Sequence, residues 1–366
     1  MAAVQLMCAR IGTVTGIGLA SVLRKHYSRR LLWFACTLLV VANTVNLAAD
    51  LGGMGAAAQL ITGLRGAIYV PVFAALIVGL LVFASYSVMT RVLKWLTLSL
   101  FAYVAAAFLA HPDWGAVLRG TLIPHVELTE DALLTVVALL GTTISPYLFF
   151  WQASQNAEEH EHVLNSLWLR RPRSLSRELR DVRADVTTGM TYSNGIMFFI
   201  ILTAGATLHG AGLTNVQTAQ QAAEALRPLA GRQASLLFTA GIVGTGLLGV
   251  PVLAGSAAYA VAEAFDWARG MDARPQAAPY FYGLITLSTA LGVAFDLLRF
   301  DPIRLLFWSA VINGLLAPPL IAIILVVCNN RAIMKRYRNR WTLNILGVAA
   351  LLVMGAAAVA LVISWL

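Results

Sequence analysis

The chain has 366 residues, of which 59% are hydrophobic and only 12% are charged. Its mean hydropathy is +0.76. A soluble fold of this length needs far more surface charge, so the composition predicts an all-α polytopic membrane protein. The formal net charge of +9 lies in short clusters between apolar stretches, where membrane topology explains it and no nucleic-acid partner is indicated. Cys8, Cys36 and Cys328 lack metal-ligand spacing and are expected to be buried free thiols.

Ten apolar stretches follow one another along the chain, and each after the first can supply the roughly 20 residues of a transmembrane helix. They cover about residues 1–22, 31–63, 67–88, 92–110, 131–157, 186–209, 233–266, 278–297, 303–328 and 341–366. If alternate connections share one side of the membrane, that side receives 19 Lys and Arg residues against 6 on the other, with Arg10 inside the first stretch. Because basic loops stay in the cytoplasm, this bias predicts an even number of crossings with both ends outside.

The first stretch is short for a transmembrane helix. Arg10 interrupts it, and Gly12, Gly16 and Gly18 follow before the first basic cluster. We expect from this opening that a further helix precedes these residues in the complete protein.

The second stretch carries three polar residues on one helical face. Asn43, Asn46 and Asp50 are spaced three and then four residues apart. A carboxylate inside a membrane helix costs at least about 2.5 kcal/mol, so we expect this face to point into the bundle and to line an ion or proton path. The alternative is interhelical hydrogen bonding by the asparagines beside a protonated, neutral Asp50.

The stretch over 131–157 contains the segment Gly-Thr-Thr-Ile-Ser-Pro-Tyr-Leu-Phe-Phe-Trp-Gln, from Gly141 to Gln152. Pro146 lacks a backbone donor and its ring clashes with a carbonyl one turn earlier, which predicts a helix break between about Thr142 and Tyr147. At membrane depth, freed carbonyl groups are tolerated only where they face protein or a water-filled cavity. A discontinuous helix is typical of a transporter's substrate site, and a proline kink without a ligand is the alternative.

Polar residues continue along this segment. The polar residues Thr142, Ser145, Gln152 and Asn156 fall on one helical face, which Phe149 interrupts. The hydroxyl groups of Thr142, Thr143 and Ser145 can bond the loosened backbone or a ligand. Residues 158–162 then read Glu-Glu-His-Glu-His, which are metal-ligand residue types. A solvated charge run is the commoner outcome for such a cluster at a cytoplasmic helix end among arginines.

Two later stretches carry packing and capping signals. The stretch from 233 to 267 is rich in glycines that allow helices to approach closely, namely Gly241, Gly244, Gly246, Gly249 and Gly255. Asp301 and Pro302 are expected at the N-cap and first position of a helix. Pro318 and Pro319 predict an irregular middle for that helix.

Three segments together resemble the natural resistance-associated macrophage protein (NRAMP) family of divalent metal transporters. Residues Asn46–Gly53 (Asn-Leu-Ala-Ala-Asp-Leu-Gly-Gly) resemble the third helix of that family, and Gly141–Tyr147 resemble its unwound sixth helix. Residues Asp301–Ser309 (Asp-Pro-Ile-Arg-Leu-Leu-Phe-Trp-Ser) resemble the start of the tenth. The order of spans and the charge bias fit from the family's second helix to its eleventh.

The resemblance implies a single transmembrane domain with the LeuT-like fold of two inverted five-helix repeats. Residues 1–130 would be the remainder of the first repeat, 131–330 the second repeat and 338–366 an additional C-terminal helix. Members of the family move divalent metals by alternating access, commonly with protons. The metal site lies where the broken first and sixth helices meet.

The resemblance also implies a metal site in which several residues differ from those usual in the family. Thr142 would offer a backbone carbonyl, and Ser145 would stand in the place of the family's metal-binding methionine. Tyr147 replaces the usual histidine after the proline, and Asp50 matches an acidic residue linked to proton movement. Gly53 stands where a glutamate is typical, which puts proton coupling in doubt.

These departures have chemical consequences. A thioether favours softer metals, and a hydroxyl removes that preference, whereas Mg²⁺ prefers oxygen donors. The chain therefore resembles the magnesium-type relatives at least as much as the manganese and iron importers. The family's first helix supplies an aspartate to the metal, and no Asp or Glu precedes Asp50 here. We expect these 366 residues alone to bind metal weakly.

Our hypothesis is a secondary transporter of divalent cations (Mn²⁺, Fe²⁺ or Mg²⁺) in a bacterial inner membrane. Two alternatives stay open: a transporter of a small organic solute with the same fold, and an incomplete or transport-inactive membrane protein with a structural role. No constellation of catalytic residues shares a membrane depth, so an enzyme is not expected. No cofactor is expected beside the metal substrate.

Overall fold

The computed structural model describes residues 1–83, 100–123, 129–166, 174–209, 212, 216, 218–224, 231, 234–271, 273–296 and 301–365. Every regular element within these residues is a helix, which confirms the predicted all-α class. Several basic residues of the predicted topology lie outside the described residues, namely Arg91, Lys94, Arg170, Arg171, Arg173, Arg227, Arg232 and Arg299. The three cysteines are free and buried, as expected.

Each of the ten predicted apolar stretches contains at least part of one helix. Their bounds are α1 Ala2–Thr15, α2 Leu19–His26, α3 Arg29–Thr62, η1 Gly66–Ile68, α4 Tyr69–Phe83, α6 Phe101–Leu109, α7 Trp114–Leu122, α8 Glu130–Thr143, α9 Pro146–Ser166, α10 Leu175–Ala204, η3 Gly205–His209, α11 Ala219–Ala223, α13 Ala234–Phe265, α14 Pro279–Asp296, α15 Pro302–Asn329, α16 Arg331–Met334, η6 Lys335–Tyr337 and α17 Trp341–Ser364. Among the described residues, six spans are long and apolar enough to cross a membrane, or seven if α1 and α2, bent by 65°, form one span. Two shorter apolar helices cover Gly66–Val82 and Pro279–Phe295.

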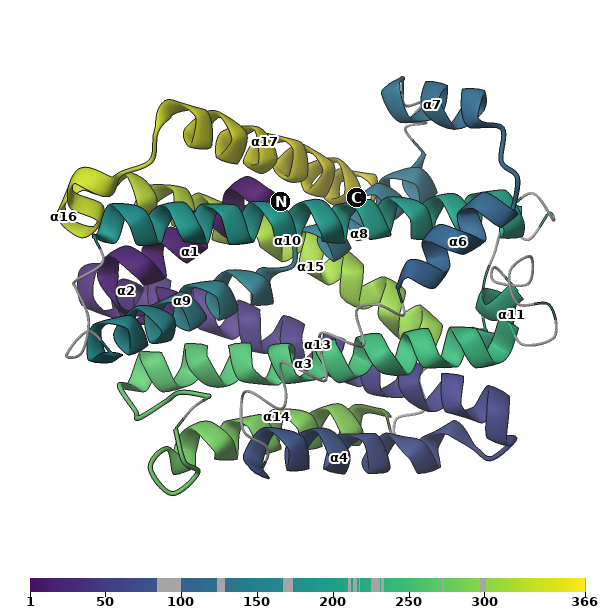
Figure 1. The fold of residues 1–366 in the computed structure, drawn as a ribbon, viewed down its shortest axis with the longest axis horizontal. Coiled ribbons are helices and arrows are strands. Elements are labelled where there is room, and N and C mark those ends of the chain that lie inside the picture. Colours follow the sequence, from purple (N-terminus) through teal and green to yellow (C-terminus); the bar gives the residue numbers. More distant parts are fainter. Residues whose placement is uncertain are drawn as a thin grey trace.

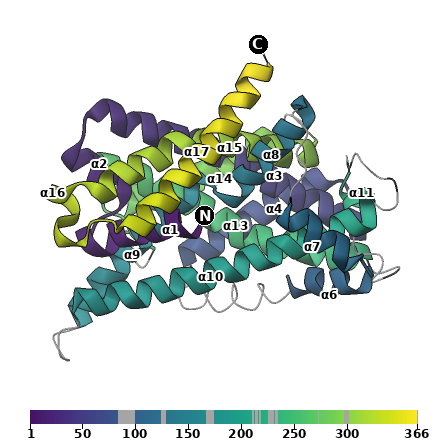
Figure 2. The same ribbon diagram turned by 90° about the horizontal axis from the view of Figure 1, so that it is seen from above.

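The long helices run side by side along one axis of the molecule (Figure 1). Helices α3, α13, α14 and α4 pack on one another, while α1 packs on α9 and α10. Helix α15 lies between α3, α8 and α17. Figure 2 shows α10 along one edge of the bundle, with α6, α7 and α11 gathered at one end of the molecule. The opposite end carries α2 and α16, which lie in the connections that the charge bias assigns to the cytoplasm.

Helix α1 is buried along most of its length, from Val4 to Thr13. Its contact with α9 depends on Gly12, because a Cβ atom there would overlap the Ala153 carbonyl group and lie 3.0 Å from the Ala157 nitrogen. The helix ends at Gly16 in the left-handed conformation (φ 65°), where glycine is favoured. The chain then bends into α2, so the first apolar stretch forms two helices at an angle.

Close approaches also occur along α13, as its glycine content predicts. A Cβ atom at Gly246 would overlap Met54 of α3, and one at Gly249 would lie 3.3 Å from the Asp50 carboxylate. At Gly255 it would meet the Trp151 ring of α9. The glycines therefore bring α13 against both α3 and α9, which fixes the position of α9 relative to α3.

Helix α15 begins at the predicted residues, and its middle is regular where an irregular one was predicted. Asp301 caps it by accepting hydrogen bonds from the backbone nitrogens of Ile303 (2.9 Å) and Arg304 (3.2 Å), with Pro302 at the start of the helix. The helix runs unbroken through Pro318 and Pro319, so the predicted irregularity is wrong. Packing on α3, α8 and α17 holds the helical path despite the two missing donors.

We predict that Asp301→Ala destabilises the protein by about 1 kcal/mol, because two backbone donors at the start of α15 lose their acceptor. The measurement is thermal unfolding in detergent. Asp113→Ala is the comparison: Asp113 caps α7 with similar bonds of 2.9 and 3.2 Å, but α7 has no buried residues, so we expect a smaller loss of stability there. Equal melting temperatures for the parent and the Asp301 variant would contradict the prediction.

Candidate functional site

The helix is interrupted at Ile144 and Ser145, between the end of α8 and the start of α9. This interval is narrower than the predicted one. Pro146 has no backbone donor, and the Ser145 hydroxyl group donates to the carbonyl oxygens of Gly141 (2.8 Å) and Thr142 (3.3 Å). A single hydroxyl group thus satisfies the backbone that the proline leaves open.

The first half of the broken helix is held tightly against α15. A Cβ atom at Gly141 would overlap the Ala310 carbonyl oxygen and the Gly314 backbone, and one at Gly314 would overlap the Val137 carbonyl oxygen. Gly141 and Gly314 therefore allow backbone-to-backbone contact between α8 and α15. This contact fixes the end of α8, where the Gly141 and Thr142 carbonyl oxygens accept from Ser145 instead of from backbone nitrogens.

The predicted site residues at the break differ in their surroundings. Ser145 is buried and Tyr147 is partly buried, whereas the Thr142 side chain is exposed. Tyr147 packs against both of the large hydrophobic clusters of the core. The Ser256 hydroxyl group of α13 donates to the Tyr147 carbonyl oxygen at 2.8 Å, which ties the start of α9 to α13.

The polar face of α3 points into the bundle, but its asparagines bond other helices. Asn43 donates to the Leu253 carbonyl oxygen of α13 at 2.8 Å. Asn46 and Asn313 of α15 exchange two amide hydrogen bonds of 3.2 and 3.1 Å. Both asparagines therefore make interhelical hydrogen bonds, as in the packing alternative, and their place on an ion or proton path stays a prediction. Asp50 lies against Gly249 of α13, and its role on an ion or proton path stays a prediction.

Gln152 belongs to a hydrogen-bonded chain of side chains between α1 and α9. It accepts from Gln5 at 2.7 Å and donates to Asn156 at 2.6 Å, and Asn156 donates to Glu159 at 3.2 Å. Gln5 was not among the residues predicted from the sequence. The signal available was an amide within a short apolar helix, which needs a partner when buried.

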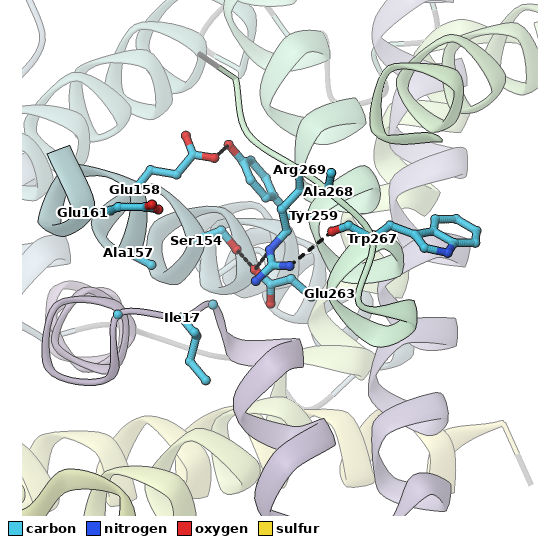
Figure 3. Close-up of a pocket in the computed structure, with 12 residues that line it drawn as sticks. Ile17, Ser154, Ala157, Glu158, Glu161, Tyr259, Glu263, Trp267, Ala268 and Arg269 are labelled. Atoms are coloured by element: carbon cyan, nitrogen blue, oxygen red, sulfur yellow. Dashed lines mark hydrogen bonds and ion pairs between the residues drawn. The ribbon is translucent and has the colours of Figure 1, made fainter. Parts of the chain in front are cut away.

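A cavity of about 280 Å³ opens at the end of the bundle that the charge bias assigns to the cytoplasm (Figure 3). Its walls come from the turn after α1, from α9 and from the end of α13. Polar side chains line it, including Ser154, Glu158, Tyr259, Glu263 and Arg269. The sequence analysis missed Tyr259 and Glu263. Glu263 could have been found as a carboxylate within a long apolar span, where charged residues mark functional positions.

The acidic and histidine run at 158–162 is divided among different partners. Glu158 accepts from the Tyr259 hydroxyl group at 2.7 Å, and His160 pairs with Glu178 of α10 at 2.8 and 3.0 Å. The part of the chain that the structure describes contains no group of three or more His, Cys, Asp or Glu residues that could hold a metal ion. This run therefore connects α9 with α13 and α10.

These features define a class of protein. Long apolar helices with polar groups turned into the bundle define an integral, multi-pass membrane protein. A helix interrupted in mid-span is the arrangement that many membrane transporters have at their substrate site.

The comparisons with known proteins place the chain within that class. The family model described as "Natural resistance-associated macrophage protein-like" matches residues 1–364. The chain belongs to this family, which the resemblance of three segments had predicted.

Two relatives with curated names are divalent metal cation transporters called MntH. The protein from Erwinia tasmaniensis is 30% identical over 258 residues, which are 67% of this chain and 57% of the relative. That match thus spans less than two thirds of the relative's length. The protein from Klebsiella pneumoniae (strain ATCC 700721 / MGH 78578) is 27% identical over 369 residues, which are 99% of this chain and 81% of the relative.

Solved structures share the fold. A manganese transporter from Eremococcus coleocola has a TM-score of 0.71 at 17% identity, covering 99% of this chain and 77% of that one. Mhp1, a nucleobase-cation-symport-1 family transporter, has a TM-score of 0.56 at 15% identity, covering 98% and 83% of the two chains. At this identity the similarity concerns the fold alone, and it confirms the predicted LeuT-like architecture.

We predict that Asn46 and Asn313 are energetically coupled, because truncation of either leaves a buried amide group without its partner. In a double-mutant cycle of Asn46→Ala and Asn313→Ala, the coupling free energy should be about 1 kcal/mol, as for interhelical hydrogen bonds in membranes. Unfolding in mixed detergent micelles measures it. Pairing Asn46→Ala with Thr286→Ala, whose hydroxyl group donates to the Tyr282 carbonyl oxygen of its own helix α14, is the control. Strictly additive effects at Asn46 and Asn313 would exclude the coupling.

Proposed function

We propose that the protein is a secondary transporter that moves divalent metal cations across a membrane by alternating access, and that it is not an enzyme. The observation that carries this proposal is the interruption of the α8–α9 helix in a chain of this family. The names of the relatives, divalent metal cation transporter and manganese transporter, support a metal substrate. Their bacterial sources support a location in a bacterial inner membrane.

We place the metal at the break in the helix. The Thr142 carbonyl oxygen accepts only a long bond of 3.3 Å, and the Ser145 hydroxyl oxygen keeps lone pairs free for a cation. Both are hard oxygen donors, which suit Mg²⁺ and Mn²⁺ and give no preference to soft metals. A cation would replace the internal hydrogen bonds of Ser145 with oxygen–metal contacts, so the helix break would act as the ligand site. We assign Gln152 to the polar path below it.

The repeat organisation forms part of the proposal. Residues 1–130 and 131–330 would be the two inverted repeats, and α17 would be the additional helix within 338–366. Broken helices from the two repeats meet at the site of such transporters. Motion of α9 relative to α13 would then expose the site to one side of the membrane at a time.

The direct test is uptake by the full-length protein in proteoliposomes that contain a metal-sensitive dye. We expect saturable entry of Mg²⁺ and Mn²⁺ that depends on the protein. Isothermal titration with Mg²⁺, Mn²⁺ and Ca²⁺ measures binding independently. Absence of both binding and uptake, with correctly folded protein, would overturn the proposed function.

We predict that Ser145→Met shifts the preference of uptake toward Mn²⁺ and Cd²⁺, because a soft thioether replaces a hard hydroxyl donor. The measurement is the ratio of Mn²⁺ to Mg²⁺ uptake. Thr143→Met is the matched control: it adds the same side chain beside the break, at a position whose hydroxyl group contacts Met197 of α10. An unchanged ratio in the Ser145 variant would mean that Ser145 is not a ligand.

We also propose that Asp50 carries the proton if protons accompany the metal. The carboxylate faces α13 in the bundle interior, and asparagine has the same shape but cannot take up a proton. Asp50→Asn should therefore abolish the response of uptake to an imposed pH gradient while metal binding persists. Identical gradient responses in the parent and the variant would exclude this role.

A further inference from the structure

Helices α9 and α13 face each other along a polar seam. The α13 residues Ser256, Tyr259 and Glu263 lie on one helical face, at spacings of three and four residues. Ser256 bonds the Tyr147 carbonyl oxygen next to the helix break, and Tyr259 donates to Glu158 one turn before the end of the seam. Glu263 closes the seam at the cytoplasmic cavity (Figure 3).

The Glu263 carboxylate is almost wholly buried, with 1% of the residue exposed. It accepts from the Ser21 backbone nitrogen at 3.0 Å and from the Ser154 hydroxyl group at 2.7 Å. The Arg269 guanidinium lies 3.6 Å away. Since Ser21 is in the first turn of α2, the carboxylate also meets the positive end of that helix.

Several further contacts beside Glu263 hold α2 against the end of α13. Gly18 leaves the space that the carboxylate fills, because a Cβ atom there would overlap it. Arg269 also donates to the Ser21 hydroxyl oxygen at 3.2 Å, and Arg24 of α2 pairs with Asp266 just beyond α13. The α2 segment and the end of α13 are therefore joined by several charged contacts.

The connection between the Glu263 carboxylate and α9 has fewer described contacts than the one with α2. Of the contacts described for the Glu263 carboxylate, only the one from Ser154 comes from α9. If this bond is released, Glu263 keeps Arg269 and the α2 backbone, so no buried charge loses its partner. The Ser154 hydroxyl group lines the cavity, where water can take over its hydrogen bond.

We propose that Glu263 is a positioning residue for the transport cycle that latches the cytoplasmic half of the broken helix. Fixed to α2 and Arg269, it holds α9 through Ser154 and keeps the cavity narrow. Release of Ser154 lets α9 move away from α13 and opens a route from the helix break to the cytoplasm. This inference rests on the proposed alternating-access function.

The test measures access to the cavity wall. Ala157 lines the cavity and is 8% exposed, so Ala157→Cys reports its opening. In inside-out vesicles without metal, a membrane-impermeant maleimide should label Ala157→Cys about tenfold faster when Ser154→Ala is added, because a charge-assisted hydrogen bond is lost. The parent chain, whose three cysteines are buried, gives the background.

Ser256→Ala is the matched control, because it removes a serine bond between the same two helices at the far end of the seam. We expect it to leave the labelling rate unchanged. Glu263→Gln should raise the rate, and adding Ser154→Ala to it should have no further effect, since both act on one contact. The melting temperature of Ser154→Ala should fall no further than that of Ser256→Ala, which also loses one serine hydrogen bond between these helices, and this separates latching from a general loss of stability.

The outcomes separate the latch from the transport function. A parental labelling rate in Ser154→Ala, or an equal increase in Ser256→Ala, would overturn the latch even if metal uptake is normal. Labelling that responds as expected in a protein without metal binding or uptake would instead overturn the proposed function. Faster Mn²⁺ efflux to the cytoplasmic side in Ser154→Ala, alongside faster labelling, would support both.

Discussion

The structure depends on one constraint, the need to satisfy the backbone around Pro146 where no bulk water is available. A helix that loses a donor in mid-span needs another group to bond its carbonyl oxygens. Ser145 supplies that group, with its hydroxyl bonded to Gly141 and Thr142. The break is therefore both stable and polar. Oxygen atoms gather at one place in the bundle without a charged residue, which suits a substrate that must enter and leave.

Close packing decides where this break lies relative to the rest of the bundle. Gly141 and Gly314 press α8 against α15, while Gly12 presses α9 against α1. The two halves of the broken helix thus rest on different neighbours. The α9 half is joined to α13 by side-chain hydrogen bonds, as at Ser256, and by the packing of Trp151 against Gly255 and Tyr259. The hydrogen bonds are individually weak and can exchange with water, whereas glycine contacts between backbones are suited to rigidity.

Membership of the NRAMP family fits these features, and the departures from its pattern give the chain its own chemistry. With Ser145 at the break, the proposed metal donors are hard oxygen atoms. With Tyr147 after the proline, a large side chain packs against both core clusters.

The sequence by itself determined the membrane class, the ten helical stretches, the break near Pro146 and the cap at Asp301, because hydropathy, proline chemistry and capping are local properties. It also carried the family's motifs. Only the tertiary structure decided which polar residues meet. Asn46 pairs with Asn313 across 267 positions, and Glu263 meets Ser21 across 242. No local pattern encodes such pairs, since they depend on how helices are rotated and how closely glycines let them approach. For the same reason the unbroken path of α15 through Pro318 and Pro319 could not be predicted: its neighbours, rather than its own sequence, hold it straight.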